Sequence, residues 1–283
     1  MTKTQIDFNK EWKKTGWQQR KSCFALRPPF WALLLLLCFI PRSLVAWPAQ
    51  AETVNPILIA HAGGGIDGHT YTNSLEALEL AIKNGFKYIE LDLIETLDGH
   101  IVAAHDWNMF HKMTGGSGGE PLTLHEFKQR KIHGKYTPLT YAEINDYFTR
   151  YNHLVLVTDK ISNYELLLKE ITVPQENLQV IMYEDEKYWE ALSKGIKKPR
   201  LCLSTKEMRD SFLAGRMDVA MVTFPLSKDF PEARKELANQ LNNGVSIFVP
   251  TSNDVDFIRN HIGTTVTGFF TDFVTLDQIF SQR

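Results

Sequence analysis

From residue 57 onward, short apolar runs alternate with longer stretches in which apolar residues recur every three or four positions. The short runs predict β-strands, and the longer stretches predict amphipathic helices. The predicted strands cover residues 57–61, 87–93, 100–105, 153–159, 177–183, 199–204, 218–224, 245–250 and 267–271. This alternation is typical of a parallel sheet covered by helices.

Between the predicted strands, helices are expected near residues 74–84, 139–151, 162–170, 185–194, 205–214, 231–242 and 253–261. The first helix has the clearest start, since Asn73 can cap it and Glu76 stands three positions further on. Nine strands within residues 52–283 fit a single-domain (β/α)8 TIM barrel of the α/β class, in which one short strand forms an extra hairpin.

The N-terminal segment differs from the rest of the chain. It begins with seven basic side chains against two acidic ones, and an apolar run of 11 residues follows at residues 30–40. That run is shorter than the roughly 20 residues that span a bilayer. Together with Ala-Gln-Ala at residues 49–51, this pattern matches an export signal. We expect residues 1–51 to be a signal peptide or, if uncleaved, an anchor in the inner membrane. Residues 52–283 would then act in the periplasm or be secreted.

The charge and cysteine content of the remaining chain narrow the classes of partner. Without residues 1–51, the chain keeps 23 basic and 31 acidic side chains, a formal net charge of −8. Nucleic-acid binding needs a basic face, so no nucleic-acid partner is expected. Cleavage also removes Cys23 and Cys38, which leaves Cys202 without a partner for an internal disulfide. Cys202 lies in an apolar Leu-Cys-Leu run and is expected to be a small core residue.

Ionisable side chains occur at or near the C-terminal ends of the first three predicted strands, where parallel α/β folds bind their ligands. Glu90 and Asp92 are two residues apart, so both point to the same face of their strand. Adjacent carboxylates repel each other unless a cation offsets them, and Ca²⁺ or Mg²⁺ suits oxygen ligands. The alternative is that both acids are hydrated at a strand end.

Two histidines each close an apolar strand. His61 and His105 can divide the work of a general base and a general acid, although each, taken singly, also fits a structural histidine. The glycines that follow His61, beginning with Gly63, allow the backbone to approach a ligand closely. Asp106 can orient an imidazole or cap the next turn.

In combination, these motifs resemble the glycerophosphodiester phosphodiesterases, within the phosphatidylinositol-specific phospholipase C-like phosphodiesterase superfamily. The family pattern runs His-Arg-Gly, Glu-Asn-Thr, Glu-x-Asp, Asp-Gly and His-Asp, in that order. The counterparts here are His61-Ala62-Gly63, Thr72-Asn73-Ser74, Glu90-Leu91-Asp92, Asp98-Gly99 and His105-Asp106. The resemblance implies a β/α barrel that cleaves phosphodiesters with a divalent cation. His61 and His105 would be the acid/base pair, and Glu90 and Asp92 would bind the metal.

Three positions depart from the family pattern. Ala62 replaces a phosphate-binding arginine, and Thr72 replaces a glutamate that often binds metal. The fourth strand, usually Glu-x-Lys, ends in Thr158-Asp159-Lys160. Aligned on the lysine, Thr158 takes the place of the glutamate, and Asp159 nominally faces the other side of the strand. If a bulge or the strand end turns Asp159 inward, it becomes a third metal ligand. Lys160 can then supply some of the phosphate-binding charge lost with the arginine.

The sequence therefore predicts an exported phosphoric diester hydrolase. Its expected ligands are small phosphodiesters such as glycerophosphodiesters, phospholipid head groups near a membrane surface, or phosphodiester-linked envelope polymers. A second class of function stays open: a non-catalytic barrel that binds a phosphorylated glycan or lipid in an envelope pathway. The losses at Ala62 and Thr72 favour that alternative.

Overall fold

A computed structural model describes residues 56–226 and 233–280. The chain divides into two units, Met1–Ala49 and Gln50–Arg283, and the described residues belong to the second. The predicted export segment, residues 1–51, lies outside the described residues, so its cleavage or anchoring stays a prediction. Within the described part of the chain, no helix is both long and apolar enough to cross a membrane.

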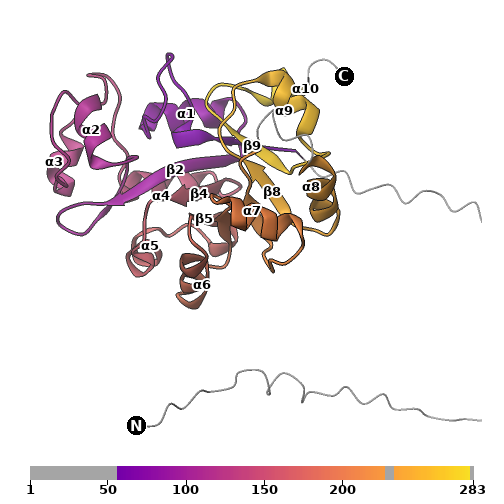
Figure 1. Cartoon of the computed structure of the whole chain (residues 1–283). Coiled ribbons are helices and arrows are strands. Elements are labelled where there is room, and N and C mark those ends of the chain that lie inside the picture. The colour runs from indigo at the N-terminus through magenta and orange to yellow at the C-terminus, as the bar shows by residue number, and fades with distance from the viewer. Residues whose placement is uncertain (1–55, 227–232, 281–283) are drawn as a thin grey trace, which may run out of the picture. The chain divides into compact units, whose positions relative to one another are not determined.

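Eight parallel strands form a closed barrel, as the sequence predicts (Figure 1). They pair in the order β1-β9-β8-β7-β6-β5-β4-β2, and pairing of β1 with β2 closes the circle. The bounds are β1 (Ile57–Ala60), β2 (Tyr88–Glu95), β4 (Val155–Asp159), β5 (Leu178–Met182), β6 (Pro199–Cys202), β7 (Met221–Thr223), β8 (Ser246–Val249) and β9 (Gly268–Thr271). The extra hairpin is β3 (Ile101–Ala103), which pairs antiparallel with the end of β2.

Helices connect the strands of the barrel. They are α1 (Leu75–Lys83), α2 (Trp107–Met113), α3 (Leu124–Lys128), α4 (Tyr141–Arg150), α5 (Tyr164–Glu170), α6 (Asp185–Ser193), α7 (Lys206–Leu213), α8 (Ala233–Asn242), α9 (Val255–His261) and α10 (Leu276–Phe280). All seven helices predicted from the sequence are present. The others, α2, α3 and α10, were not predicted from the sequence; they are seven, five and five residues long.

Between β3 and α4 the chain makes an excursion from the barrel, and Figure 1 shows its helices α2 and α3 set to one side. The excursion has a small apolar core of its own, in which Phe110 and Phe127 stack with ring centroids 4.4 Å apart. Asp106 caps α2 by accepting a hydrogen bond from the backbone N–H of Met109 at 2.8 Å. The residue before that cap is His105, so the start of α2 helps to place this histidine.

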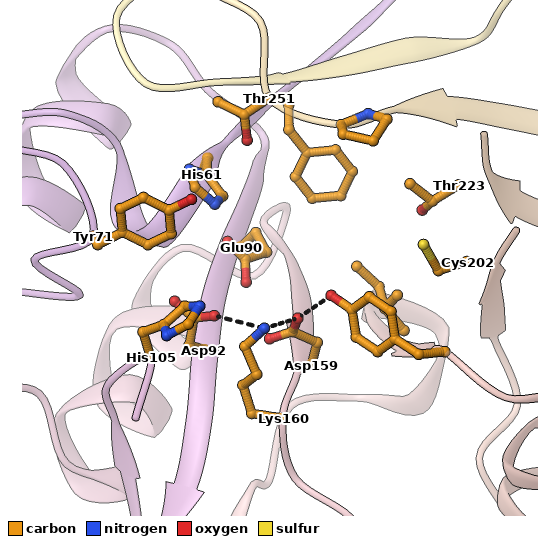
Figure 2. Close-up of a pocket in the computed structure, with 14 residues that line it drawn as sticks. His61, Tyr71, Glu90, Asp92, His105, Asp159, Lys160, Cys202, Thr223 and Thr251 are labelled. Carbon is orange, nitrogen blue, oxygen red and sulfur yellow. Dashed lines mark hydrogen bonds and ion pairs between the residues drawn. The ribbon is translucent and has the colours of Figure 1, made fainter. Parts of the chain in front are cut away.

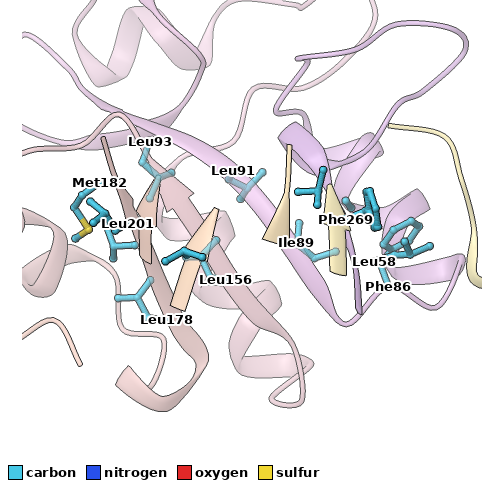
Figure 3. Close-up of a cluster of buried hydrophobic side chains, with 14 of the residues drawn as sticks. Leu58, Phe86, Ile89, Leu91, Leu93, Leu156, Leu178, Met182, Leu201 and Phe269 are labelled. Carbon is cyan, nitrogen blue, oxygen red and sulfur yellow. The ribbon is translucent and has the colours of Figure 1, made fainter. Parts of the chain in front are cut away.

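Alternation along β2 separates the core from the site. Ile89, Leu91 and Leu93 point outward into the apolar layer between strands and helices, which Figure 3 shows. Glu90 and Asp92 point to the other side, into the barrel, as the spacing of two predicts. The barrel interior is filled by a separate apolar cluster of Ile59, Val157, Ile181, Phe248 and Phe270.

A charged side chain also lies inside the barrel. Arg200 on β6 is fully buried, with its guanidinium carbon 3.7 Å from the centroid of the Phe248 ring. It donates a hydrogen bond to the side chain of Gln179. Burial lowers the pKa of Arg200 to about 9, so the guanidinium stays charged at neutral pH. Cys202 lies two residues further along the same strand, so Arg200 belongs to the layer of side chains beneath the mouth of the barrel.

The start of α1 differs from the sequence prediction. Ser74, not Asn73, is the N-cap, because its hydroxyl accepts a hydrogen bond from the N–H of Ala77 at 3.3 Å. Asn73 has a left-handed backbone with a φ of 47° and is fully buried. Its side chain is therefore directed away from the helix and is used at the site described next.

Candidate active site

A cavity of about 240 Å³ opens at the C-terminal ends of the barrel strands. Six predicted site residues line it: His61, Glu90, Asp92, His105, Asp159 and Lys160. Figure 2 shows these side chains converging from separate strands on one space. Residues 99 positions apart in the chain are thus brought together at the end of a parallel barrel where ligands bind.

Three carboxylates form a cluster that lines one side of the cavity. Glu90, Asp92 and Asp159 are all buried, and each offers an oxygen within 4.8 Å of the oxygens from the other two. Asp92 and Asp159 are direct register partners on the neighbouring strands β2 and β4. Regular parallel pairing therefore builds the cluster from two strands without a special loop.

The placement of Asp159 corrects one step of the sequence interpretation. Val157 belongs to the interior cluster, so Asp159, two residues later, faces inward by ordinary alternation. Thr158 is the residue on the opposite face, and no bulge interrupts the pairing of β4 with β2. The alignment on the lysine was wrong because it assumed that Lys160 continues the strand.

Lys160 instead leaves the strand in a left-handed conformation with a φ of 62°. This turn brings two consecutive side chains to the same cavity, which an extended strand would not allow. Its ammonium nitrogen lies 3.0 Å from Asp159 Oδ2 and 3.9 Å from Asp92 Oδ1. A left-handed backbone is uncommon for a lysine, and such strain concentrates at functional sites.

A ring of hydrogen bonds holds the carboxylates in place. The N–H of Ala62 donates to Glu90 Oε2 at 2.7 Å. Asn73 donates from its amide to Asp92 Oδ2 at 2.9 Å and accepts from the Asp92 N–H at 3.0 Å. The hydroxyl of Tyr183 donates to Asp159 Oδ2 at 2.5 Å. These supports fix the acids in one arrangement, as partners of metal ligands commonly do.

Both histidines are oriented by a carboxylate at the same ring atom. Nδ1 of His61 lies 2.8 Å from Asp272 Oδ1, and Nδ1 of His105 lies 2.6 Å from Asp106 Oδ2. Hydrogen bonds from His61 and Asn253 overcome the burial of Asp272 and hold its pKa below the usual value. A hydrogen bond from the Met109 N–H, and then His105, likewise lower the pKa of Asp106.

These ionised carboxylates can only accept hydrogen bonds, so the proton of each neutral imidazole resides on Nδ1. Nε2 of each ring is then the atom that can take or give a proton. Tyr71 stands between the two rings, with its centroid 4.7 Å from that of His61 and 5.3 Å from that of His105, both edge-on. The structure therefore places at one cavity two imidazoles whose Nε2 atoms can exchange a proton.

Three residues that support the histidines and acids were missed by the sequence analysis. Asp272 lies 211 residues from His61, and Tyr71 and Tyr183 lie in segments without a motif. The Gly-Phe-Phe-Thr-Asp end of β9 carries a signal for Asp272, since it delivers an acid at the C-terminal end of a strand. Tyr71, with a φ of 58°, gives no comparable signal.

The electrostatics of the acidic cluster favour a bound cation. Burial, followed by the charges of Asp92 and Asp159, raises the pKa of Glu90 well above its usual value. Burial and the charge of Asp159 raise the pKa of Asp92 to about 6. Burial opposes the charge of Lys160, but the neighbouring carboxylates outweigh it and raise the pKa of the ammonium. The lysine alone does not neutralise three acids.

The three acids fit a divalent ion. Oδ1 of Asp159 is buried and has no hydrogen-bond partner among the described residues, a costly state for a carboxylate oxygen. An ion about 2.4 Å from each ligand oxygen can bridge oxygens up to about 4.8 Å apart. Glu90, Asp92 and Asp159 are thus the residues that would hold the ion, and the cavity side would leave room for water or a ligand oxygen.

Comparison of the chain with known proteins identifies its family. The model of the glycerophosphoryl diester phosphodiesterase family matches residues 63–239, more than half of the chain. The chain belongs to this family. Among curated relatives, a probable glycerophosphodiester phosphodiesterase 1 of Mycobacterium tuberculosis is 29% identical over 85 residues. That match spans 30% of this chain and 30% of the relative.

Solved structures support the same fold. A glycerophosphodiester phosphodiesterase of Thermotoga maritima superimposes with a TM-score of 0.62 and 22% identity, covering 77% of this chain and 95% of that one. An Oleispira antarctica phosphodiesterase in complex with the product sn-glycerol-3-phosphate gives a TM-score of 0.63 and 19% identity, covering 82% and 98%. Likeness at this level of identity shows the shared barrel.

The structure shows the position of each residue that departs from the family pattern. Ala62 is fully buried in a left-handed turn, with a φ of 49°, and contributes its N–H to Glu90. Thr72 is buried, and its hydroxyl contacts that of Ser74 at 3.0 Å, so it is not part of the acidic cluster. Asp159 supplies the third carboxylate of this family member.

Two further predictions need correction. Gly63 is buried and is not among the residues that line the cavity, and its left-handed φ of 83° belongs to the turn after β1. Cys202 is not a plain core residue, because it lines the cavity. Burial raises the pKa of its thiol to about 11, which keeps it neutral.

Proposed function

We propose that this protein is an exported, metal-dependent phosphodiesterase that hydrolyses glycerophosphodiesters or related phospholipid or envelope phosphodiesters. One observation carries the proposal: two imidazoles, each fixed at Nδ1 by a carboxylate, line the same cavity as three buried carboxylates. Family membership gives the reaction class. The product named for the Oleispira antarctica relative, sn-glycerol-3-phosphate, indicates a ligand of suitable size.

The residues divide the chemistry among them. Nε2 of one histidine takes a proton from the nucleophile, which is water or a neighbouring hydroxyl of the substrate that forms a cyclic phosphate. Nε2 of the other gives a proton to the leaving oxygen. Lys160 places a positive charge beside the phosphoryl group. A divalent cation, Ca²⁺ or Mg²⁺, supplies further neutralisation of the phosphate charge when bound.

The reaction is tested with purified protein, glycerophosphocholine and bis(p-nitrophenyl) phosphate, each with and without Ca²⁺ or Mg²⁺. We expect turnover that depends on the ion and falls at least 100-fold in His61→Asn and His105→Asn. His153→Asn, a change at an exposed histidine away from the cavity, is the matched control. Folded protein without ion-dependent turnover of either diester would overturn the proposal.

Export is tested separately, by expressing the full chain and determining the N-terminus of the product. A mature protein that begins at Glu52 supports cleavage after Ala51. An intact chain recovered with the inner membrane supports the anchor instead. Recovery of the intact chain from the cytoplasm would contradict both.

A non-catalytic barrel is the second candidate, favoured by Ala62 and Thr72, because neither side chain can hold phosphate or metal. Calorimetry with Ca²⁺ and Mg²⁺ separates the two candidates. A barrel of this second kind should bind neither ion tightly at Glu90 and Asp92, whereas the enzyme should lose tight binding on Glu90→Gln.

A further inference from the structure

The cavity has two chemically unlike sides. Strands β1, β2 and β4, with the end of β3, contribute the histidines, the acids and Lys160. Strands β5 to β8 and β9 contribute Cys202, Thr223, Thr251 and apolar side chains. Figure 2 shows Cys202 and Thr223 together, across the cavity from the histidines. The strand order agrees, since β7 lies diametrically opposite β2 in the closed barrel.

Thr223 is the polar residue on this second side whose environment is hardest to explain by the fold alone. Its side chain lines the cavity and is 5% exposed, and its hydroxyl has no hydrogen-bond partner among the described residues. An unpaired buried hydroxyl destabilises a protein, and valine would fill the same volume without that cost. A ligand hydroxyl would supply the missing partner.

The neighbours of Thr223 suit an uncharged group. Cys202 is its register partner on β6, and Thr251 follows β8 with its hydroxyl directed toward the cavity in Figure 2. Among the described lining residues, those from β5 to β8 and the turns after them include no Asp, Glu, Lys, Arg or His. On this side, the lining residues that the structure describes therefore offer no charged side chain that could form an ion pair with an ammonium or a carboxylate of the ligand.

We propose that the side of the cavity formed by β6, β7 and β8 binds one alcohol of the phosphodiester as a small, uncharged, hydroxylated group, and that Thr223 selects it through a hydrogen bond to a hydroxyl. The inference rests on the proposed phosphodiesterase function. It goes further by assigning the choice of alcohol to Thr223. It also predicts that any charged part of the substrate binds elsewhere than on the side formed by β6, β7 and β8.

The test compares two chromogenic diesters with one leaving group: p-nitrophenyl glyceryl phosphate and p-nitrophenyl propyl phosphate, which lacks the hydroxyls. We expect the wild-type protein to prefer the glyceryl ester at least tenfold in kcat/KM, of which about tenfold is the effect of one hydrogen bond. Thr223→Val should lower this ratio about tenfold, and Thr223→Ser, which keeps the hydroxyl, should retain it.

Thr267→Val is the matched control, because Thr267 is also buried but its hydroxyl already accepts from the N–H of Ile247 at 2.9 Å. It should lower Tm and leave the ratio unchanged, whereas Thr223→Val should not lower Tm. Calorimetry with glycerol 3-phosphate and propyl phosphate gives a second ratio that needs no turnover.

The outcomes separate the two proposals. A wild-type ratio of one in both assays, or a ratio that survives in Thr223→Val, overturns the role of Thr223 while phosphodiester hydrolysis stands. No turnover of either ester, with preferential binding of glycerol 3-phosphate that Thr223→Val removes, overturns the catalytic function and supports the alcohol site.

Discussion

The imidazole of His61, at the end of the first strand of the barrel, is held by the carboxylate of Asp272, just past the last strand, across 2.8 Å. Pairing of β1 with β9 in register brings these chain segments side by side, with Ala60 opposite Thr271. The residue that sets the tautomer of His61 is therefore positioned by the β1–β9 pairing, one of the pairings that close the barrel. Asn253 supports the same carboxylate from the β8–α9 loop at 2.8 Å.

Replacement of Asp272 tests this orientation. Asp272→Asn keeps the shape but removes the charge that stabilises a protonated His61 and fixes the proton on Nδ1. We expect kcat on a phosphodiester to fall about 100-fold, with a smaller change in KM, because proton transfer and not binding is impaired. Asp256→Asn, at an exposed acid on α9, is the control. Full activity of Asp272→Asn would show that His61 needs no carboxylate partner.

The stability of the metal-free protein should depend on pH in a direction set by the buried acids. Both Glu90 and Asp92 have pKa values above the roughly 4 of an unfolded chain. The folded state therefore binds more protons than the unfolded state between about pH 4 and pH 6 or above. Their contribution to stability is complete below pH 4 and is lost as the pH rises through the folded-state values.

Thermal unfolding in a chelator at pH 5 and pH 8 measures this effect. We expect a lower Tm at pH 8 in chelator and recovery of Tm on adding Ca²⁺ or Mg²⁺, since the ion replaces the protons. A metal-free Tm that rises from pH 5 to pH 8 would contradict the raised pKa values.

Glu90→Gln separates metal binding from folding. The amide can still accept from the N–H of Ala62, but one of three mutually repelling charges is gone. We expect the metal-free Tm at pH 8 to stay level or rise. An ion at 100 times its Kd adds about 2.7 kcal/mol to the wild-type protein, roughly 5–10 °C in a domain of this size. The variant should lose that shift, and Glu95→Gln, at an exposed end of the same strand, should keep it.

Substitution of Asn73 tests how much its left-handed backbone and its hydrogen bonds to Asp92 affect stability. Asn73→Ala removes both hydrogen bonds to Asp92 and places an alanine in the left-handed region. Asn73→Gly removes the same hydrogen bonds without the backbone penalty. We expect both variants to lose stability and affinity for the ion, with alanine about 1 kcal/mol less stable than glycine. Chemical denaturation measures the difference, and equal stabilities would show that φ at residue 73 carries no strain.

The sequence was sufficient to predict the barrel and the histidines and acids that line the cavity, but not the residues that support them. Every predicted strand is present, because apolar runs bounded by polar turns are local signals, and Glu90 with Asp92 follows from the spacing of two alone. The inward position of Asp159 was predicted only through a bulge or the strand end, because the left-handed turn at Lys160 is invisible to an alignment of strand residues. Ordinary alternation along β4 is what places it there.

The remaining residues depend on contacts that local sequence cannot show. The use of Asn73 at Asp92 required the β1–α1 loop to turn through several left-handed residues, and asparagine before a helix is ordinarily read as a cap. Tyr183 meets Asp159 only because β5 lies beside β4 in the closed barrel. Topology and strand register determine which side chains support the acids, so these contacts can be identified only after the strands have been placed in space.

Closure of the barrel by β9 has a consequence for biogenesis. A chain folding from its N-terminus can bring the acids of β2 and β4 together early, yet His61 gains its carboxylate partner only when residues 268–272 have docked. An incompletely synthesised or unclosed molecule would hold a cation site without an oriented base. Residues 268–272 thus couple closure of the barrel to the orientation of His61.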